Sequence, residues 1–336
     1  MAVCFRPPEQ LESIGPSLIS VRHQLLVTGA GGFVGQALTF EAVARGLRVR
    51  AASRYCSAFP ETIECVFVAA GVDGSTDWHD ALTGCDVVAH LAARAHVMHD
   101  TTTEPFTEFR KVNLDGTLNL ARQAASAGVK RFVFISSIGV NGSETFSAPF
   151  VVKDEPAPHS PYAVSKHEAE LGLKALALET GMEVVIVRPP IVYGPNAPGN
   201  FGSLMRWLSR GLPLPLGAVT QNRRSLVGLD NLVDLILTCV QHPKAANQTF
   251  LVSDGEDLST TELLQKVGKA MNRPVRLLPV PVSLLAFVAR LLGKTAVAQR
   301  LLGSLQVDIS RTCELLDWKP PVSVDEGLRR AAQQRL

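Results

Sequence analysis

The first half of the chain alternates short apolar runs with longer stretches that have helical periodicity. After an apolar run beginning at Leu25, a helix is expected from Gln36 to about Arg45, because Gly46 is a usual stop signal. The further strands are predicted at Arg48–Ala52, Glu64–Ala69, Val87–Leu91, Arg131–Ser136 and Glu183–Arg188, and helical patterns include Phe106–Ala127 and Ser160–Leu178. Strands that alternate with helices form right-handed βαβ units, so the pattern predicts an α/β fold with a parallel sheet.

From Pro189 onward prolines and glycines become frequent, and the strand–helix alternation stops. Helices are predicted at Asp230–His242, at Ser259–Met271 with a Ser259/Glu262 capping box, and from about Val324. Asp230 reads as the N-cap of its helix. A strand near Thr249–Val252 could return to the main sheet, so the two halves interleave. We predict a poorly ordered arm (1–22), a dinucleotide-binding domain (23–190) and a smaller, mostly helical substrate lobe (191–336) over the carboxyl ends of the strands.

The apolar run at Leu25 is followed by three glycines spaced G-x-x-G-x-x-G, just before a helix. Gly29 permits a sharp turn, Gly32 lets backbone approach a pyrophosphate, and Gly35 allows close helix–strand packing. N–H groups at the helix start, around Phe33 and Val34, favour a phosphate. The stretch predicts a dinucleotide site in a Rossmann-type doubly wound sheet, although a plain glycine-rich turn is the alternative.

The composition mainly argues against particular classes of partner and site. The 336 residues are 46% hydrophobic and 19% charged, as in globular proteins with a substantial core, and the net charge of +2 gives no strong attraction to nucleic acid. Six scattered cysteines without a C-x-x-C pair argue against a zinc site or a disulfide framework, and favour a reducing cytoplasm. We therefore expect no metal.

No segment predicts membrane insertion. The N-terminal 17 residues lack the apolar core of a secretory signal. The longest apolar run, Val282–Leu292, is interrupted by Ser283 and Arg290 and is too short to span a bilayer. It reads as an amphipathic core helix, with contact to a membrane surface as the alternative.

Two groups of residues could carry chemistry. Tyr162 and Lys166 are four positions apart early in a predicted helix, so they share one face, and an ammonium beside a phenol favours the phenolate. Ser136 and Ser137 end the strand beginning at Arg131, 25 positions before Tyr162. Alone, the tyrosine and lysine could be a surface pair, and the serines could cap the end of a strand. Together with the glycine turn, the two groups indicate a redox site.

The chain resembles extended short-chain dehydrogenases/reductases of the nucleotide-sugar epimerase/dehydratase group. The resemblance runs from about Leu25 to Trp318 and rests on TGAGGFVG, HLAA, NLDGTLNL, FISSIGVNG, YAVSK and RPPIVYGP, in the family's order. It implies Tyr162 as general acid/base, Lys166 as its pKa-lowering partner and ribose ligand, and Ser137 as a hydrogen-bond donor to the sugar oxygen. It also implies that Asn113 supports the lysine.

The resemblance implies two sets of binding residues. The expected cofactor contacts are Gly29, Gly32, Phe33, Val34, Gly35, Ser53, Arg54, Val72, Leu91, Ala92, Ala93, Asn113, Ser136, Tyr162, Lys166 and Pro189. The expected contacts to a UDP-sugar are Ser137, Asn141, Tyr162, Asn200, Leu216 and Arg224, with Arg223 able to exchange roles with Arg224. A guanidinium suits the pyrophosphate through bidentate hydrogen bonds. A homodimer is common in this family.

The end of the second strand departs from the NAD-binding pattern. Where that pattern has an acidic residue for the adenosine ribose, this chain has Ser53 followed by Arg54. A guanidinium without a carboxylate accommodates a 2′-phosphate, which favours NADPH over NAD.

An exchangeable NADPH suits reduction, and Asn141 replaces a tyrosine of the epimerase pattern. The nearest resemblance is to bacterial enzymes that reduce UDP-2-acetamido-4-keto-2,6-dideoxyhexose to UDP-N-acetyl-quinovosamine or UDP-N-acetyl-fucosamine for surface polysaccharide. The alternative is a UDP-sugar 4-epimerase with tightly bound NAD. A non-catalytic regulator is disfavoured by the intact Ser137/Tyr162/Lys166 set, and a dehydratase by Ile138 and Gly139 after Ser137.

Overall fold

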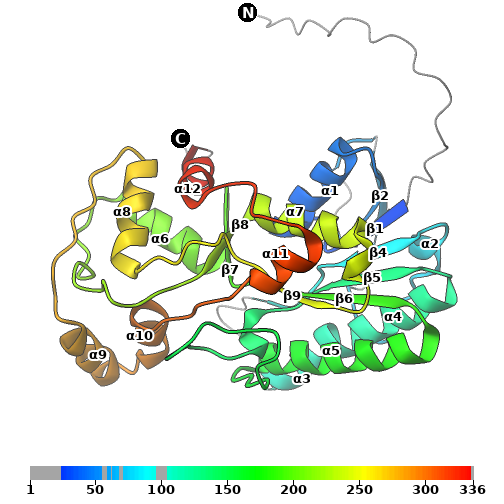
Figure 1. Ribbon diagram of the computed structural model, residues 1–336, viewed down its shortest axis with the longest axis horizontal. Coiled ribbons are helices and arrows are strands. Elements are labelled where there is room, and N and C mark those ends of the chain that lie inside the picture. The colour runs from blue at the N-terminus through cyan, green and yellow to red at the C-terminus, as the bar shows by residue number, and fades with distance from the viewer. Residues whose placement is uncertain (1–23, 55–58, 62, 68–70, 96–103, 334–336) are drawn as a thin grey trace, which may run out of the picture.

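The main body of the protein is a parallel sheet in the order β3-β2-β1-β4-β5-β6-β9 (Figure 1). The structure, a computed structural model, describes residues 24–54, 59–61, 63–67, 71–95 and 104–333, so the predicted arm lies outside the described residues. The strands are β1 (Gln24–Thr28), β2 (Arg48–Ser53), β3 (Glu64–Phe67), β4 (Val87–His90), β5 (Arg131–Ile135), β6 (Glu183–Arg188) and β9 (Thr249–Leu251). The parallel, Rossmann-type α/β sheet predicted from the sequence is thereby confirmed.

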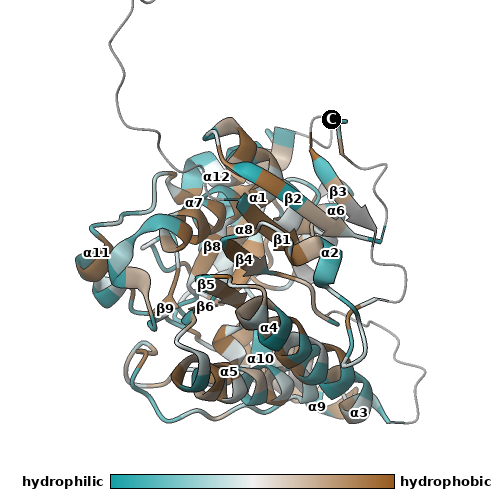
Figure 2. Cartoon of the chain, turned by 90° about the vertical axis from the view of Figure 1, so that its right-hand side faces the viewer, coloured by the Kyte–Doolittle hydropathy of each residue, from teal (hydrophilic) through white to brown (hydrophobic). Residues whose placement is uncertain are grey.

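Helices cover both faces of this sheet. α1 (Phe33–Ala44), α7 (Leu229–Gln241) and α11 (Ser310–Leu316) lie on one face; α2 (His79–Leu82), α3 (Pro105–Arg110), α4 (Thr117–Ser126) and α5 (Pro161–Thr180) lie on the other (Figure 1). Neighbouring strand residues point to opposite faces, so Leu25 and Val27 join one hydrophobic cluster and Leu26 joins the other. The central strands are therefore mostly apolar, as the brown colour of β1, β4 and β5 in Figure 2 shows.

The segment predicted as one helix over Phe106–Ala127 is three elements. Between α3 and α4 lies a π-helical turn, η2 (Lys111–Gly116). Extra residues of this kind inside a helix are frequent at functional sites. α5 follows its prediction closely, because Ser160 accepts a hydrogen bond from the N–H of Ala163 at its start and Gly181 ends it at φ 75°.

The second half of the chain forms a lobe that also contributes to the main sheet. It holds the short parallel pair β7 (Ile191–Tyr193) and β8 (Leu226–Gly228), the 3₁₀ turn η4 (Pro243–Ala245), and helices α6 (Gly199–Ser209), α8 (Thr260–Ala270), α9 (Val282–Leu291), α10 (Thr295–Leu302) and α12 (Val324–Gln333). β9 pairs with β6 in the main sheet, as expected, and the Ser259/Glu262 capping box is present. Asp230 is not an N-cap: Gly228 occupies that position, and Asp230 pairs with Arg330.

Two expectations are not met. Val282–Leu292 is helical as predicted, but the core assignment is wrong because α9 has no buried residue. Cys65 in β3 is disulfide-bonded, although the scattered cysteines argued against a disulfide framework. Among the helices of the described residues, none is long and apolar enough to cross a membrane.

Arg131 fixes the end of α7 to the edge of the sheet. Its Nη1 donates hydrogen bonds to the carbonyls of Cys239, Val240 and His242, and its Nη2 lies 2.7 Å from Glu183. These carbonyls are otherwise among the unsatisfied acceptors at a helix C-terminus.

We expect Arg131→Met to lower the free energy of unfolding by roughly 2–4 kcal/mol, because it leaves buried carbonyl acceptors without a donor. The control is Lys130→Met, since the Lys130 side chain is 69% exposed in its pair with Asp86; it should cost less than about 1 kcal/mol. Chemical denaturation compares the two, and equal losses would contradict this role of Arg131.

Candidate active site

The predicted site residues gather at one edge of the sheet because the carboxyl ends of parallel strands meet there. The glycine turn follows β1, Ser53 ends β2, Leu91–Ala93 follow β4, Ser136 and Ser137 follow β5, and Pro189 follows β6. Residues far apart in the sequence are thus brought to one edge of the sheet.

The backbone at the glycine turn leaves no room for side chains. Gly29 has φ +68°, and a Cβ on it would lie 2.7 Å from the backbone N of Ala92. A Cβ on Gly35 would lie 2.1 Å from the carbonyl O of Gly29, so α1 packs tightly on β1. Gly32 is exposed and caps α1 without a side-chain hydrogen bond. This start of α1 fits a dinucleotide pyrophosphate through its N–H groups.

Phe33 and Val34 follow Gly32, and both side chains pack inward. Their expected contacts with the cofactor would therefore be made by backbone N–H groups. Phe33 packs against the hydrophobic cluster of the lobe, and Val34 against the cluster beneath α7. Ser53 is 8% exposed at the end of β2, and a Cβ on Gly31 would lie 2.7 Å from its Oγ. Arg54 is exposed beside it. The NADPH preference drawn from these two residues stays a prediction.

Tyr162 and Lys166 lie on the first two turns of α5. Lys166 is 1% exposed, its Nζ donates a 2.8 Å hydrogen bond to the carbonyl of Ile135, and it lies 4.4 Å from the centroid of the Phe134 ring. Tyr162 is partly exposed, and the edge of Phe109 packs against its ring. The lysine is therefore fixed to the end of β5, beneath the tyrosine.

The protonation of this pair differs from the expectation. Burial raises the pKa of Tyr162 to about 12, and burial lowers the pKa of Lys166 to about 7, with Glu170 opposing that shift. Loss of hydration is the cause of the raised phenol pKa, so the role of Lys166 as a pKa-lowering partner stays a prediction for the enzyme with cofactor and substrate bound. In the protein alone, burial thus shifts both groups toward their neutral forms.

Ser137 lies close to the start of α5. Its Oγ accepts a 3.1 Å hydrogen bond from the N–H of Gly139 in the 3₁₀ turn η3 (Ile138–Val140). A Cβ on Gly139 would lie 3.4 Å from the Cβ of Ala163, the residue after Tyr162. The structure therefore brings Ser137 and Tyr162 to the same end of α5, as their predicted roles require.

A buried polar network lies beneath these residues. Glu170 and Arg188 form a bidentate ion pair with hydrogen bonds of 2.9 and 2.5 Å, and both side chains are at most 4% exposed. Ser136 donates to Glu170 at 2.5 Å, and Arg188 donates to the side-chain O of Asn141 at 2.9 Å. Asn141 also donates to the carbonyl of Val151 and is 2% exposed. Its expected contact with substrate is not supported, because both ends of its amide are already bonded.

Asn113 fixes the loop after β4 to α5. Its side-chain O accepts from the N–H of Arg94, and its amide donates to the carbonyl of Arg94 and to Ser165 Oγ, next to Lys166. The π-helical turn η2 carries this residue, and the sequence patterns gave no sign of that turn. Val72 packs closely on Gly116 in the same turn, where a Cβ would lie 2.7 Å from it.

The lobe residues expected to bind substrate have different outcomes. Arg223 lies at the surface near Glu262, whereas Arg224 donates to the carbonyl of Gly303. Burial lowers the pKa of Arg224, Glu144 opposes this and Arg300 adds to it. Arg224 therefore has a carboxylate, Glu144, and a second guanidinium, Arg300, in its electrostatic neighbourhood.

Two other expected substrate contacts are in the same lobe. Leu216 is 8% exposed in its hydrophobic cluster, so a side-chain contact with substrate is not supported. Asn200 lies in the first turn of α6, and its side chain is outside the described residues.

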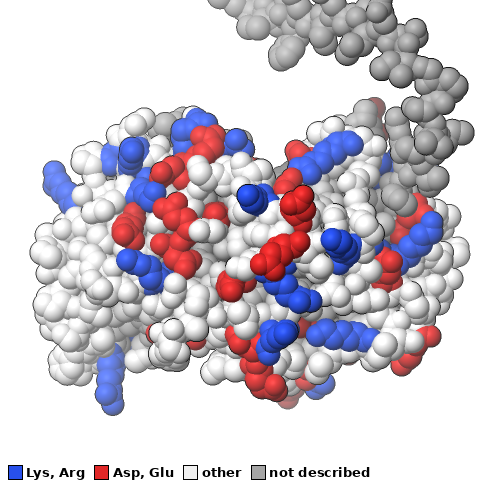
Figure 3. Space-filling model, in the orientation of Figure 1, with Lys and Arg blue, Asp and Glu red and all other residues white. Residues whose placement is uncertain are grey.

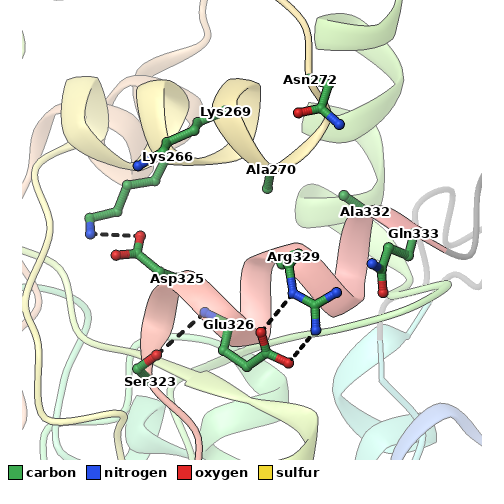
Figure 4. A pocket seen from close by; sticks show the side chains of 10 residues that line it. All are labelled: Lys266, Lys269, Ala270, Asn272, Ser323, Asp325, Glu326, Arg329, Ala332 and Gln333. Atoms are coloured by element: carbon green, nitrogen blue, oxygen red, sulfur yellow. Dashed lines mark hydrogen bonds and ion pairs between the residues drawn. The ribbon is translucent and has the colours of Figure 1, made fainter.

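A cavity of about 500 Å³ lies away from the strand ends, between α8 and α12 (Figure 4). Lys266 of α8 donates to Asp325 of α12 across it, and Arg329 donates to Glu326 within α12. Both of its carboxylates are paired with basic side chains, and none of the predicted site residues lines it. The candidate active site is therefore the set of residues at the carboxyl ends of the strands.

We expect Glu170→Gln to lower the free energy of unfolding by roughly 3–5 kcal/mol, because it leaves the buried Arg188 charge unpaired. Adding Arg188→Met should recover part of that loss. Glu168→Gln is the matched control on the same helix, since Glu168 and Arg110 form a pair that is 29% and 46% exposed. Chemical denaturation of the variants measures the losses, and a Glu170→Gln protein as stable as the control would contradict the assignment.

His90 makes stability depend on acid pH. It is fully buried between Thr28 and Thr117, and burial, reinforced by Lys166, lowers its pKa from 6.5 to about 3. A lowered folded-state pKa contributes stability above pH 6.5 that is lost as pH falls toward 3.

His90→Gln should therefore reduce the stability lost between pH 6.5 and 4.5, of which roughly 2–3 kcal/mol comes from this residue. The exposed His79→Gln variant should keep the full loss. Denaturation midpoints at the two pH values test this, and equal losses in both variants would remove His90 as the cause.

Comparison with known proteins agrees with this geometry. Residues 25–253 match the model of the NAD dependent epimerase/dehydratase family. A protein of Vibrio cholerae named UDP-glucose 4-epimerase is 50% identical over 92% of this chain and 94% of its own length. An Escherichia coli O157:H7 protein named N-acetyl-alpha-D-glucosaminyl-diphospho-ditrans,octacis-undecaprenol 4-epimerase is 26% identical over 93% of this chain and 95% of its own.

The fold also matches solved structures. The Thermotoga maritima UDP-glucose 4-epimerase, solved with UDP-glucose, superposes with a TM-score of 0.74 over 93% of this chain and 98% of its own, at 21% identity. The family match and the 50% identical relative lead to one conclusion: the chain belongs to the NAD dependent epimerase/dehydratase family.

Proposed function

We propose that the protein is a UDP-sugar 4-epimerase of the UDP-glucose or UDP-N-acetylglucosamine type that keeps NAD bound. The observation that carries this proposal is the 50% identity, over 92% of the chain, to a relative named UDP-glucose 4-epimerase. The sequence alone favoured a ketoreductase, with the epimerase as the alternative. This identity reverses that preference. The glycine turn, Tyr162 and Lys166 at one edge of the sheet support either reaction.

The chain's residues would act on the C4 oxygen of the sugar. A bound nicotinamide would accept a hydride from C4 and return it to the other face of the ketone. The Tyr162 phenolic oxygen removes the proton of the C4 hydroxyl in one direction and returns it in the other. Ser137 Oγ holds that oxygen, and Lys166 takes up or releases a proton close to neutral pH.

Arg224 and Arg300 are suited to the diphosphate of the substrate. The Vibrio cholerae and Escherichia coli relatives are named for different substrates, yet both substrates carry a hexose on a diphosphate. Arg224 is partly buried, so the guanidinium is weakly hydrated before an anion arrives. This pair would recognise the diphosphate, which the two substrates share, and leave sugar selection to the rest of the site.

A ketoreductase is the second candidate, supported by Ser53 and Arg54 at the end of β2. It would use NADPH to reduce the 4-keto group of a UDP-4-keto-6-deoxy-N-acetylhexosamine. The two reactions differ in their demand for reductant: an epimerase consumes no cofactor, whereas a reductase consumes one NADPH for each sugar.

One experiment separates the candidates. Purified protein is acid-denatured and the released nicotinamide identified; native protein is then incubated with UDP-glucose, UDP-N-acetylglucosamine, or the 4-keto sugar with NADPH or NADH, and products are read by NMR. Released NAD and interconversion of C4 epimers without added cofactor are the expected result. Turnover only of the 4-keto sugar, with NADPH consumed, would overturn the epimerase in favour of the reductase.

We expect Tyr162→Phe to lower kcat at least about 100-fold, because the proton at the C4 oxygen loses its acceptor. Bound nicotinamide should remain. Tyr193→Phe makes the same change at a buried tyrosine whose hydroxyl donates to Asp254, and should alter stability more than kcat. Steady-state kinetics and cofactor content measure both, and a Tyr162→Phe enzyme within threefold of wild-type kcat would exclude the tyrosine.

A further inference from the structure

α9 presents an apolar face to solvent, although the rest of the lobe has a well-packed core. Its side chains Leu284, Phe287, Val288, Leu291 and the adjoining Leu292 follow the spacing i, i+3, i+4, i+7 and i+8, so they share one face. Their exposed fractions run from 43% for Val288 to 70% for Leu291. Leu285, on the inner side, packs against the lobe. We call these five residues the α9 face.

The apolar surface continues beyond the helix on both sides. Leu278, before α9, is 50% exposed, and Val297, in α10, is 51% exposed. In Figure 1 α9 lies at the outer corner of the lobe, far from the sheet. Large contiguous apolar surfaces of this kind mark sites of interaction rather than ordinary solvent-exposed surface.

The chain segment that carries the α9 face is itself basic, although Lys266 in it pairs with Glu256 and Asp325, and Glu144 accepts a hydrogen bond from Gln299 of α10. Residues 263–307 contain no aspartate or glutamate and seven basic residues: Lys266, Lys269, Arg273, Arg276, Arg290, Lys294 and Arg300. Within the described part of the chain, no ion pair involves Arg276, Arg290 or Lys294. The corner that α9 occupies in Figure 3 is almost uncharged, with a basic side chain at its edge. A net charge of +2 for the whole chain conceals this asymmetry.

We propose that the α9 face docks the protein on the surface of an anionic lipid bilayer. A short helix with one apolar face and basic residues at its border lies in the plane of the membrane interface, with the apolar side chains among the acyl chains. Arg290 follows Phe287 by three positions and Lys294 follows the helix, so their long side chains reach the phosphate level. The proposal goes beyond the sugar chemistry and does not depend on it.

The charge pattern favours lipid over a second copy of the chain. A two-fold interface through the α9 face would place Arg290 and Lys294 near the same residues of the partner. The segment 263–307 offers no carboxylate to compensate them. An anionic lipid surface supplies that compensation and also accepts the apolar side chains.

The test is co-sedimentation of the full chain with vesicles of equal parts phosphatidylglycerol and phosphatidylcholine, against vesicles of phosphatidylcholine alone. We expect at least about tenfold more protein bound to the anionic vesicles, decreasing with added salt. Phe287→Ser with Leu291→Ser should lower that binding at least about tenfold. Arg290→Gln with Lys294→Gln should lower it and weaken its salt dependence.

The matched control is Leu178→Ser, a leucine on α5 that is 90% exposed outside the α9 face; it should bind as wild type does. Circular dichroism and thermal unfolding verify that every variant is folded. Absence of wild-type binding, or equal binding by Phe287→Ser/Leu291→Ser, overturns the proposal. A wild-type dimer in light scattering that this double variant dissociates, without vesicle binding, assigns the face to a second copy instead.

Discussion

The buried ion pair between Glu170 and Arg188 is the constraint on which the candidate active site depends. Glu170 is on α5, one turn beyond Lys166, and Arg188 ends β6. Through Ser136 and Asn141 the pair also holds the end of β5 and the turn after it. Two charges removed from water persist only with good geometry and full hydrogen bonding, and this network supplies both. The elements that carry Ser137, Tyr162 and Lys166 are thereby fixed relative to one another.

Local patterns predicted the parts of the structure that depend on local rules. The strands could be predicted from their apolar runs, because both of their faces are buried. The tight turn could be predicted from Gly29 and Gly35, because it leaves no room for a Cβ at either position. The Ser259/Glu262 box depends on four consecutive residues. What could not be predicted depends on packing between distant segments: the π-helical turn with Asn113, the bonding of Asn141 and the burial of Leu216.

The same distinction explains the errors about charge and exposure. An ammonium lowers the pKa of a nearby phenol only while the ammonium keeps its charge, and burial of Lys166 against Phe134 disfavours that charge. An apolar helical run suggests a core only if a partner covers it, and α9 has no buried residue. Burial decides both the charge of Lys166 and the exposure of α9, and sequence patterns do not report burial.

The pairing of β9 with β6 bears on how such a protein can diversify. The lobe is built from chain that leaves the sheet after β6 and again after β9, and α7 returns it to the sheet in between. Insertions or deletions in either excursion would leave the register of the central strands untouched. Evolution can therefore alter the lobe through these two excursions of the chain, while the half of the molecule built on the central strands is kept unchanged.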